Sequence, residues 1–329
     1  MDGGMDWSEY ERNPFPLGSG MEGLERRSVD WPEPSSMPLI LDTDIGGEPD
    51  DALALAVAAG VPALSLVITS DEYGDRRARL ARCLLDLMGR SDVPVVAGAD
   101  LGNDHSWTVE GMVPDRIGSQ PRDVSAAVAK VLERSGGPVG WVGLGPMSNL
   151  ARLLQQNPAI GDRLVVTQQE GASNFAEQGP HRNIELDMGA ARYVFASGIH
   201  PWIVSADISF HPLNALTKDS IEYEVLKKGI DPARNLLRIH LDLWFNEFSR
   251  YVTLHGPITL AQSIGMPFLA ATPADTALDD DGRLTHGNST AYIAQSADYD
   301  EFRRWLVNRL ERVESKLVRH PAADYSTDV

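Results

Sequence analysis

The sequence has little cysteine and no long apolar run. Cys83 is the only cysteine in 329 residues, so the chain cannot form an internal disulfide, which fits a reducing compartment. No apolar run approaches the roughly 20 residues that a membrane-spanning helix needs. The N-terminus also lacks the basic and then apolar pattern of a signal peptide. We therefore expect a cytoplasmic protein, with Cys83 as a small core residue in a helix rather than a nucleophile.

Basic residues are also scarce relative to acidic ones. The chain has 29 Lys and Arg against 47 Asp and Glu, a formal net charge of −18. This charge argues against nucleic acid or an anionic membrane as a partner, because their phosphates would be repelled. A phosphate-cradling P-loop and a dinucleotide fingerprint are missing too, since Gly18-Ser19-Gly20 has no preceding strand. A small molecule remains the expected partner.

Residues 38–57 carry the most informative pattern in the chain. The apolar run at 39–41 ends in Asp42-Thr43-Asp44, which is typical of a buried strand that delivers both carboxylates on one side. A glycine-rich turn follows, and Asp50-Asp51 opens an Ala/Leu-rich helix. Four carboxylates at one strand-to-helix crevice suit Ca²⁺ or Mg²⁺. The alternative is a helix cap with solvated loop acids, but a cap needs only one aspartate.

The rest of the chain alternates between strand and helix patterns. This alternation predicts one α/β domain with a doubly wound, mostly parallel open sheet, helices on both faces and a helical C-terminal part from about residue 219. We expect residues 1–37 to be an N-terminal extension draped over the domain through Trp7, Tyr10, Phe15 and Trp31, residues 38–320 to be the single domain, and 321–329 to be a tail. The predicted strands are 63–69, 93–97, 139–144, 164–167, 200–206, 267–272 and 291–295, and the predicted helices are 75–90, 123–134, 187–197, 235–254 and 299–317, with a long loop at 98–122.

Residues 42–55 resemble the signature of the inosine–uridine-preferring nucleoside hydrolase family. Further segments follow in the family's order at 92–99, 144–150, 183–187 and 254–257, so the resemblance covers about residues 38–315. It implies an enzyme that hydrolyses the N-glycosidic bond of a ribonucleoside, or of a related ribosylated compound, through a metal-activated water and an oxocarbenium-like transition state. It also implies a homo-oligomer, either a dimer or a tetramer.

The resemblance assigns a role to each matching residue. Ca²⁺ would bind the ribose hydroxyls and a water, held by Asp44, Asp51 and the backbone carbonyl of Leu144. Asp44 would also take the proton of the water. The remaining roles are support of the water network by Asp42, binding of the sugar by Asp50, Asn183 and Asn174, and protonation of the departing base by His255, for which a helix C-terminal cap is the alternative.

Two departures from the family pattern affect these expectations. The family's usual aspartate ligand after the histidine is replaced by Gly256, so we expect Ca²⁺ to bind weakly or not at all, with Asp71 as a candidate substitute ligand. The family's usual Glu-Phe before the asparagine is His181-Arg182 here. A positive charge at that place would suit a 5′-phosphate. Alternatively, Arg182 points outward and His181 only forms hydrogen bonds.

Two other classes of function stay open from the sequence. A phosphatase of the haloacid dehalogenase type would use Asp42 as nucleophile and Asp44 as acid. That class expects Thr or Val where Gly46 stands, and a later acidic pair that is missing here. A relative that binds a nucleoside or ribosyl ligand without a metal or without hydrolysis is the second alternative, because a fold does not guarantee an activity.

Overall fold

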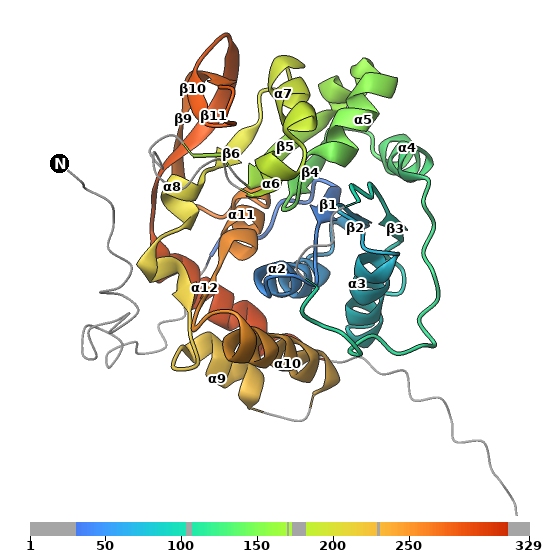
Figure 1. The fold of residues 1–329 in the computed structure, drawn as a ribbon, viewed down its shortest axis with the longest axis vertical. Coiled ribbons are helices and arrows are strands. Elements are labelled where there is room, and N and C mark those ends of the chain that lie inside the picture. The colour runs from blue at the N-terminus through green and yellow to red at the C-terminus, as the bar shows by residue number, and fades with distance from the viewer. Residues whose placement is uncertain (1–30, 103–106, 170, 173–181, 229–230, 315–329) are drawn as a thin grey trace, which may run out of the picture.

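The computed structural model describes residues 31–102, 107–169, 171–172, 182–228 and 231–314. A nine-stranded sheet in the order β10-β9-β11-β6-β5-β4-β1-β2-β3 forms its centre (Figure 1). The pairs from β3 through β6 to β11 are parallel, and only β9 runs antiparallel to β10 and β11. The strands are β1 Leu39–Thr43, β2 Leu64–Thr69, β3 Val95–Ala97, β4 Val139–Gly143, β5 Leu164–Gln169, β6 Trp202–Val204, β9 Leu269–Leu278, β10 Leu284–His286 and β11 Ser289–Ala297, with β7 Ala215–Leu216 and β8 Val252–Thr253 as a separate pair.

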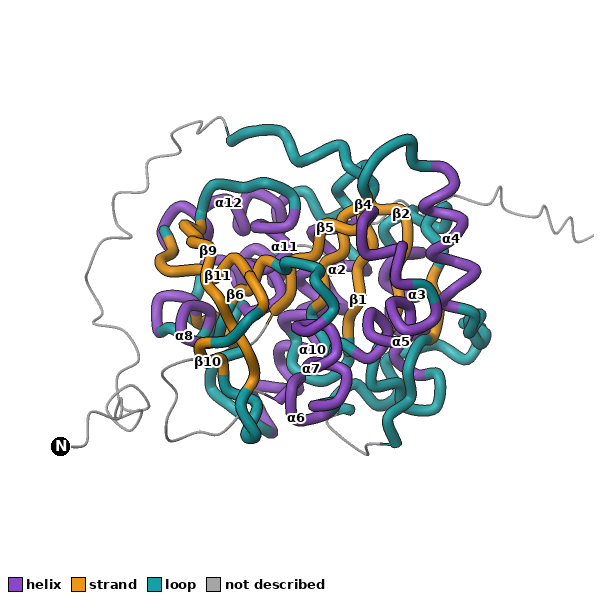
Figure 2. The backbone as a smooth tube through the Cα atoms, turned by 90° about the horizontal axis from the view of Figure 1, so that it is seen from above, coloured by secondary structure: helices purple, strands orange, loops and turns teal. Residues whose placement is uncertain are grey.

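Both faces of the sheet are covered by helices. Leu39 and Leu41 of β1 pack into one hydrophobic core and Ile40 into another, as the period of two in a strand requires. The strands form one layer through the middle of the molecule (Figure 2). The first core receives α2 Asp50–Ala59, α3 Arg76–Leu87, α10 Pro232–Glu247, α11 His255–Ser263 and α12 Tyr299–Glu311, and the second receives α4 Val124–Arg134, α5 Ser148–Gln156 and α7 Met188–Ala196.

The strand order determines where a ligand site can form. The first six strands lie as 3-2-1-4-5-6, so the direction of winding reverses between β1 and β4. The chain that follows β1 and the chain that follows β4 run in opposite directions along the sheet, and a crevice therefore opens at the carboxyl ends of these two strands. The doubly wound, mostly parallel fold is therefore confirmed, and Asp42, at the carboxyl end of β1, lies at the crevice.

The predicted C-terminal elements are wrong in their bounds. The strand predicted at 267–272 continues to Leu278 as β9 and pairs with β11. Pro273 does not end it, because its partner Tyr292 donates its backbone N–H to the Pro201 carbonyl on the other side of β11. The helix predicted at 235–254 ends at Glu247, before the short strand β8.

The segments that surround the sheet agree with several smaller expectations. Cys83 is a buried free cysteine in α3, and burial raises the pKa of its thiol. Trp31 donates its Nε1–H to Glu301 at 2.6 Å, so this part of the extension lies against α12. Trp7, Tyr10 and Phe15 lie outside the described residues. Within the described chain, no helix is both long and apolar enough to cross a bilayer.

Replacing Phe302 by alanine should strongly destabilise the fold. Its side chain is 0% exposed and packs edge-to-face against Phe268, with ring centroids 6.0 Å apart. A cavity at such a position costs about 3–5 kcal/mol of unfolding free energy. The matched control is Phe248→Ala, because Phe248 is 54% exposed. Urea unfolding of both variants measures the effect, and equal losses in the two would contradict this account of the core.

Candidate active site

Asp42 is the buried acid at the end of β1. Asp42 is two residues after Ile40 and so lies on the same face of the sheet, the face that packs against α5. There Asn149 donates from Nδ2 to Asp42 Oδ1 at 3.0 Å. The same amide donates to the Thr69 carbonyl at 3.0 Å and accepts from the backbone N–H of Ala99 at 2.8 Å. Burial, with a smaller effect from the charge of Asp44, raises the pKa of Asp42 to about 8. Asn149 therefore fixes the acid in place.

Asp51 approaches the same strand end from the first turn of α2. Its Oδ2 accepts hydrogen bonds from the Thr43 hydroxyl and, at 3.1 Å, from the backbone N–H of Asp44. Burial raises its pKa strongly, and the negative charge of Asp44 raises it further. The Asp44 and Asp51 carboxyl groups are also close enough to share a hydrogen bond. The two predicted metal ligands are thus brought together.

Asp50 and Glu48 connect this crevice to the first turn of α11 and to β8. Asp50 Oδ2 accepts from the backbone N–H of Gly256 at 2.8 Å, and Glu48 Oε1 accepts from that of Thr253 at 3.0 Å. Burial raises the pKa of Glu48 to about 7. The pKa of Asp50 is also raised, first by burial and then by the negative charges of Asp51 and Glu48. Sequence reasoning gave Glu48 no role, although its place in the turn between the acid pairs was a usable signal.

Asp44 lies at the electrostatic centre of the crevice. Its negative charge contributes to the raised pKa of every neighbouring acid that is shifted, namely Asp42, Glu48, Asp50 and Asp51. Like charges this close disfavour ionisation of one another unless a positive group lies between them. The crevice is therefore built to favour a cation or a cationic transition state.

Arg77 is a buried cation beside the crevice that the sequence analysis missed. Its guanidinium is 1% exposed as a side chain and donates to the backbone carbonyls of Asp44, Ile45 and Asp71. It also lies 3.5 Å from Asp71 Oδ2, so the charge of Asp71 is compensated there. This ion pair weakens the case for Asp71 as a substitute metal ligand. The available signal was the helical spacing of Arg77 with Leu80 and Leu84 on the apolar face of α3.

The turn between β1 and α2 is held from outside by an aromatic residue and a histidine. Gly46 has φ +104°, and a Cβ there would lie 2.4 Å from the Trp107 ring, so only glycine fits. His240 of α10 hydrogen bonds through Nε2 to the Gly47 carbonyl at 2.9 Å and to the Thr108 hydroxyl at 3.1 Å. Burial lowers the pKa of His240 to about 4. A neutral imidazole therefore fastens the acid-bearing turn to α10.

The remaining predicted residues lie around the mouth and floor. Asn183, in α6 Arg182–Leu186, donates from Nδ2 to the Leu144 carbonyl at 2.6 Å. His255 begins α11, so the alternative that it caps a helix C-terminus is wrong. Its Nδ1 lies 2.8 Å from Ser209 Oγ and its ring stacks on Phe210. Arg182 is exposed, and its charge lowers the pKa of Glu48. His181 and Asn174 lie outside the described residues.

Comparison with known proteins explains this arrangement. The family model for inosine-uridine preferring nucleoside hydrolases matches residues 39–304. The chain belongs to this family. It is therefore an N-ribohydrolase that cleaves the N-glycosidic bond of ribonucleosides. A pyrimidine-specific ribonucleoside hydrolase RihA of Escherichia coli (strain SMS-3-5 / SECEC) is 27% identical over 274 residues, covering 77% of this chain and 87% of that protein.

Solved structures of nucleoside hydrolases share the fold. A plant nucleoside hydrolase superposes with a TM-score of 0.72 at 19% identity, covering 85% of this chain and 100% of that one. A purine-preferring ribonucleoside hydrolase from Gardnerella vaginalis gives a TM-score of 0.69 at 20% identity, covering 84% and 98%. The likeness of fold therefore extends over most of the chain and not only over the signature segment.

The residues at the crevice do not fit a tightly bound Ca²⁺. Ca²⁺ takes six to eight oxygen ligands. Here Asp44 and Asp51 are the only expected carboxylate ligands, since position 256 is glycine, and the Leu144 carbonyl already accepts from Asn183. Among the described residues, no group of three or more His, Cys, Asp or Glu side chains could hold a metal ion. The raised pKa values of these acids favour their protonated forms in the empty crevice, and a bound cation would favour the ionised forms.

Restoring a carboxylate at position 256 should strengthen Ca²⁺ binding. A Cβ on Gly256 would lie 3.1 Å from Asp51 Oδ1, so the Gly256→Asp side chain would begin beside an expected ligand. We expect the variant to bind Ca²⁺ at least about tenfold more tightly than the wild type, because affinity follows ligand charge and number. Isothermal titration calorimetry measures this. The control is Gly118→Asp, an exposed site with open space around it; submicromolar affinity in the wild type would refute the account.

The buried His240 should make the protein sensitive to acid. Its pKa of about 4 in the fold lies below the usual 6.5, so the unfolded state binds the proton first as the pH falls. The stability from this residue is present above pH 6.5 and is lost progressively down to pH 4. Between pH 7 and 5 the loss is about 2 kcal/mol.

The variant His240→Gln removes the titrating group and should lose less stability over that range. Chemical denaturation at several pH values measures the difference. His200→Gln is the matched control, because His200 is exposed. An unchanged pH dependence in His240→Gln, or the same change in both variants, would contradict the assignment.

Proposed function

We propose that this chain hydrolyses ribonucleosides with Asp44 as the general base and the neighbouring acids as electrostatic stabilisers. The observation that carries the proposal is the position of Asp44 at the β1/β4 switch point. It follows β1, packs against Gly145 after β4, and donates its backbone N–H to Asp51 Oδ2 at 3.1 Å. The family membership supports the reaction class.

The chemistry follows from the charge of the crevice. Breaking an N-glycosidic bond produces an oxocarbenium-like sugar, whose positive charge develops in the transition state. Buried carboxylates stabilise that charge more than they stabilise the neutral substrate, which lowers the barrier. Asp44 takes the proton of the attacking water. Asp42, fixed by Asn149, supports this water, and no step requires a tightly bound metal.

The sugar and the base are assigned to opposite sides of the crevice. Asp50 and Asn183 are proposed to hold ribose hydroxyls, since both lie on rigid helix starts and are anchored by backbone hydrogen bonds. His255 is proposed to protonate the departing base near neutral pH. The Ser209 hydroxyl at Nδ1 and the stacked Phe210 ring orient the imidazole for this.

Arg182 is the observation behind the second candidate, an enzyme acting on a 5′-phosphorylated nucleoside. Its positive charge acts on Glu48, so the protein already supplies a carboxylate partner. The negative charge of Asp44, which acts on Glu48 as well, would repel a phosphate. We therefore favour a substrate with an uncharged 5′ end. Resemblance to the family also supports a homo-oligomer of two or four copies acting in the cytoplasm.

Assays of uridine, inosine and their 5′-monophosphates test the proposal. We expect release of ribose from at least one nucleoside and slower release of ribose 5-phosphate, because of the repulsion by the acids. Both bases are included because one relative is named pyrimidine-specific and one structural neighbour purine-preferring. Reducing-sugar detection gives kcat/KM for each. The Asp44→Asn variant should lose at least about 100-fold, the usual contribution of a general base.

The control variant is Asp115→Asn, which removes an exposed carboxylate from the long loop and should leave kcat/KM unchanged. Faster cleavage of a monophosphate would transfer the assignment to the second candidate. Binding of nucleosides without ribose release would indicate the non-hydrolytic relative.

A further inference from the structure

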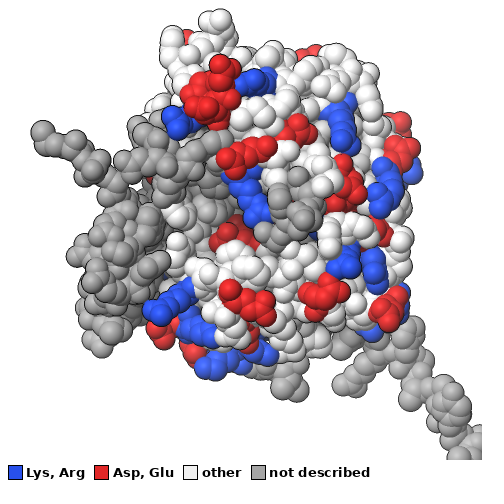
Figure 3. Space-filling view, viewed as in Figure 1, with Lys and Arg blue, Asp and Glu red and all other residues white. Residues whose placement is uncertain are grey.

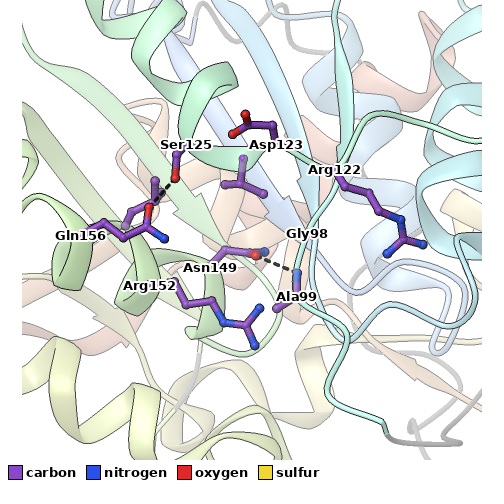
Figure 4. A pocket seen from close by; sticks show the side chains of 10 residues that line it. Gly98, Ala99, Arg122, Asp123, Ser125, Asn149, Arg152 and Gln156 are labelled. Carbon is purple, nitrogen blue, oxygen red and sulfur yellow. Dashed lines mark hydrogen bonds between the residues drawn. The ribbon is translucent and has the colours of Figure 1, made fainter.

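A second cleft lies beside the catalytic crevice, on the other side of Asn149. It has a volume of about 500 Å³ and is lined by the segment after β3, the start of α4 and one side of α5 (Figure 4). Its lining includes Gly98, Ala99, Arg122, Asn149, Arg152 and Gln156. This volume is within the range of pockets that take small molecules.

The floor of this cleft is rigid. The amide oxygen of Asn149 accepts a hydrogen bond from the backbone N–H of Ala99. Its amide nitrogen donates to the Asp42 carboxylate and to the Thr69 carbonyl. A Cβ on Gly98 would lie 2.3 Å from the Thr69 carbonyl oxygen and 2.4 Å from Asn149 Oδ1, so only glycine permits this close packing. Because Asn149 lies between the cleft and Asp42, the two cavities are separate.

Two positively charged side chains, Arg122 and Arg152, line the cleft. The Arg122 and Arg152 side chains lie on either side of Gly98 and Ala99 in Figure 4. Both arginines are exposed, and the described residues provide neither of them with an ion pair or a side-chain hydrogen bond. On the face drawn in Figure 3, acidic and basic side chains are interspersed.

The other polar groups of the cleft are already paired. Ser125 Oγ donates to Gln156 Oε1 at 2.6 Å, and the Asp123 carboxylate accepts from the Ala126 N–H at the start of α4. Asp123 is the N-cap residue of α4, and it is the one acidic residue in this lining, which also contains two arginines. With two arginines and one aspartate, the lining has a formal charge of +1, whereas the whole chain has a formal charge of −18. The cleft therefore presents one guanidinium group on each side of Gly98 and Ala99.

We propose that this cleft binds a small phosphorylated metabolite at a site distinct from the nucleoside crevice. Guanidinium groups match phosphate oxygens in charge and in paired hydrogen-bond geometry. The positive end of the α4 dipole adds to the attraction. The volume exceeds what inorganic phosphate fills, so the phosphate carries an uncharged organic part that lies along Val124 and Leu153.

Calorimetric titration of the full chain tests this site. The probe is glycerol 3-phosphate, chosen because a ribose phosphate could enter the nucleoside crevice; glycerol and inorganic phosphate are the comparison ligands. We expect glycerol 3-phosphate to bind most tightly. The double variant Arg122→Gln/Arg152→Gln should weaken its affinity at least tenfold, and each single variant should weaken it partly. Arg134→Gln, an exposed arginine at the far end of α4, should not change it.

Each alternative result overturns the proposal. Affinity for glycerol 3-phosphate no greater than for glycerol would remove the anion site. Equal affinity for inorganic phosphate would remove the organic part of the ligand, and an unchanged affinity in the double variant would place binding elsewhere. The readout is independent of the proposed hydrolysis, because binding is measured without a nucleoside. The double variant should also retain wild-type nucleoside turnover.

Discussion

The structure depends on burying several carboxylates at one strand end without letting their repulsion open the fold. Burial alone raises the pKa of each, and the charge of Asp44 adds to the effect on its four shifted neighbours. Hydrogen bonds to the ionised forms offset part of this cost. The donors come from β1, α5, β8 and the first turn of α11. Acids from one short stretch of sequence are therefore stabilised by residues as many as 206 positions away.

The acids come from one stretch of sequence and their hydrogen-bond donors from distant elements, and this arrangement links the fold to the proposed chemistry. Repulsion between like charges destabilises the empty site. The positive charge that develops on the sugar in the transition state reduces this repulsion, so the site stabilises the transition state more than the neutral substrate and lowers the barrier to bond cleavage. Asn149, Thr43 and the backbone N–H groups hold the acids in fixed positions, so little reorganisation is needed during reaction. Arg77 holds the carbonyls of the same turn from behind, without entering the crevice.

Local pattern was enough to predict the strand, turn and helix from Asp42 to Asp51, because each acid follows from its place in a short periodic segment. The doubly wound sheet also followed from the alternation of strands and helices. Long-range partners could not be predicted. His255 was assigned to a helix end because the amphipathic pattern of α10 runs on past Glu247, and the extent of β9 depends on its pairing with β11. Arg77 and Asn149 gain their roles only when distant strands meet.

Gly256 stands where the family usually has an aspartate, and this single difference changes the charge of the crevice. A carboxylate there would begin 3.1 Å from Asp51 Oδ1 and would add a further negative charge to the crevice. That charge would raise the pKa of Asp51 further unless a bound cation compensated it. Glycine removes the charge, and its backbone N–H donates to Asp50 instead. The position thus changes from a supplier of negative charge to a group that stabilises one, which is the change that a crevice with weak metal binding requires.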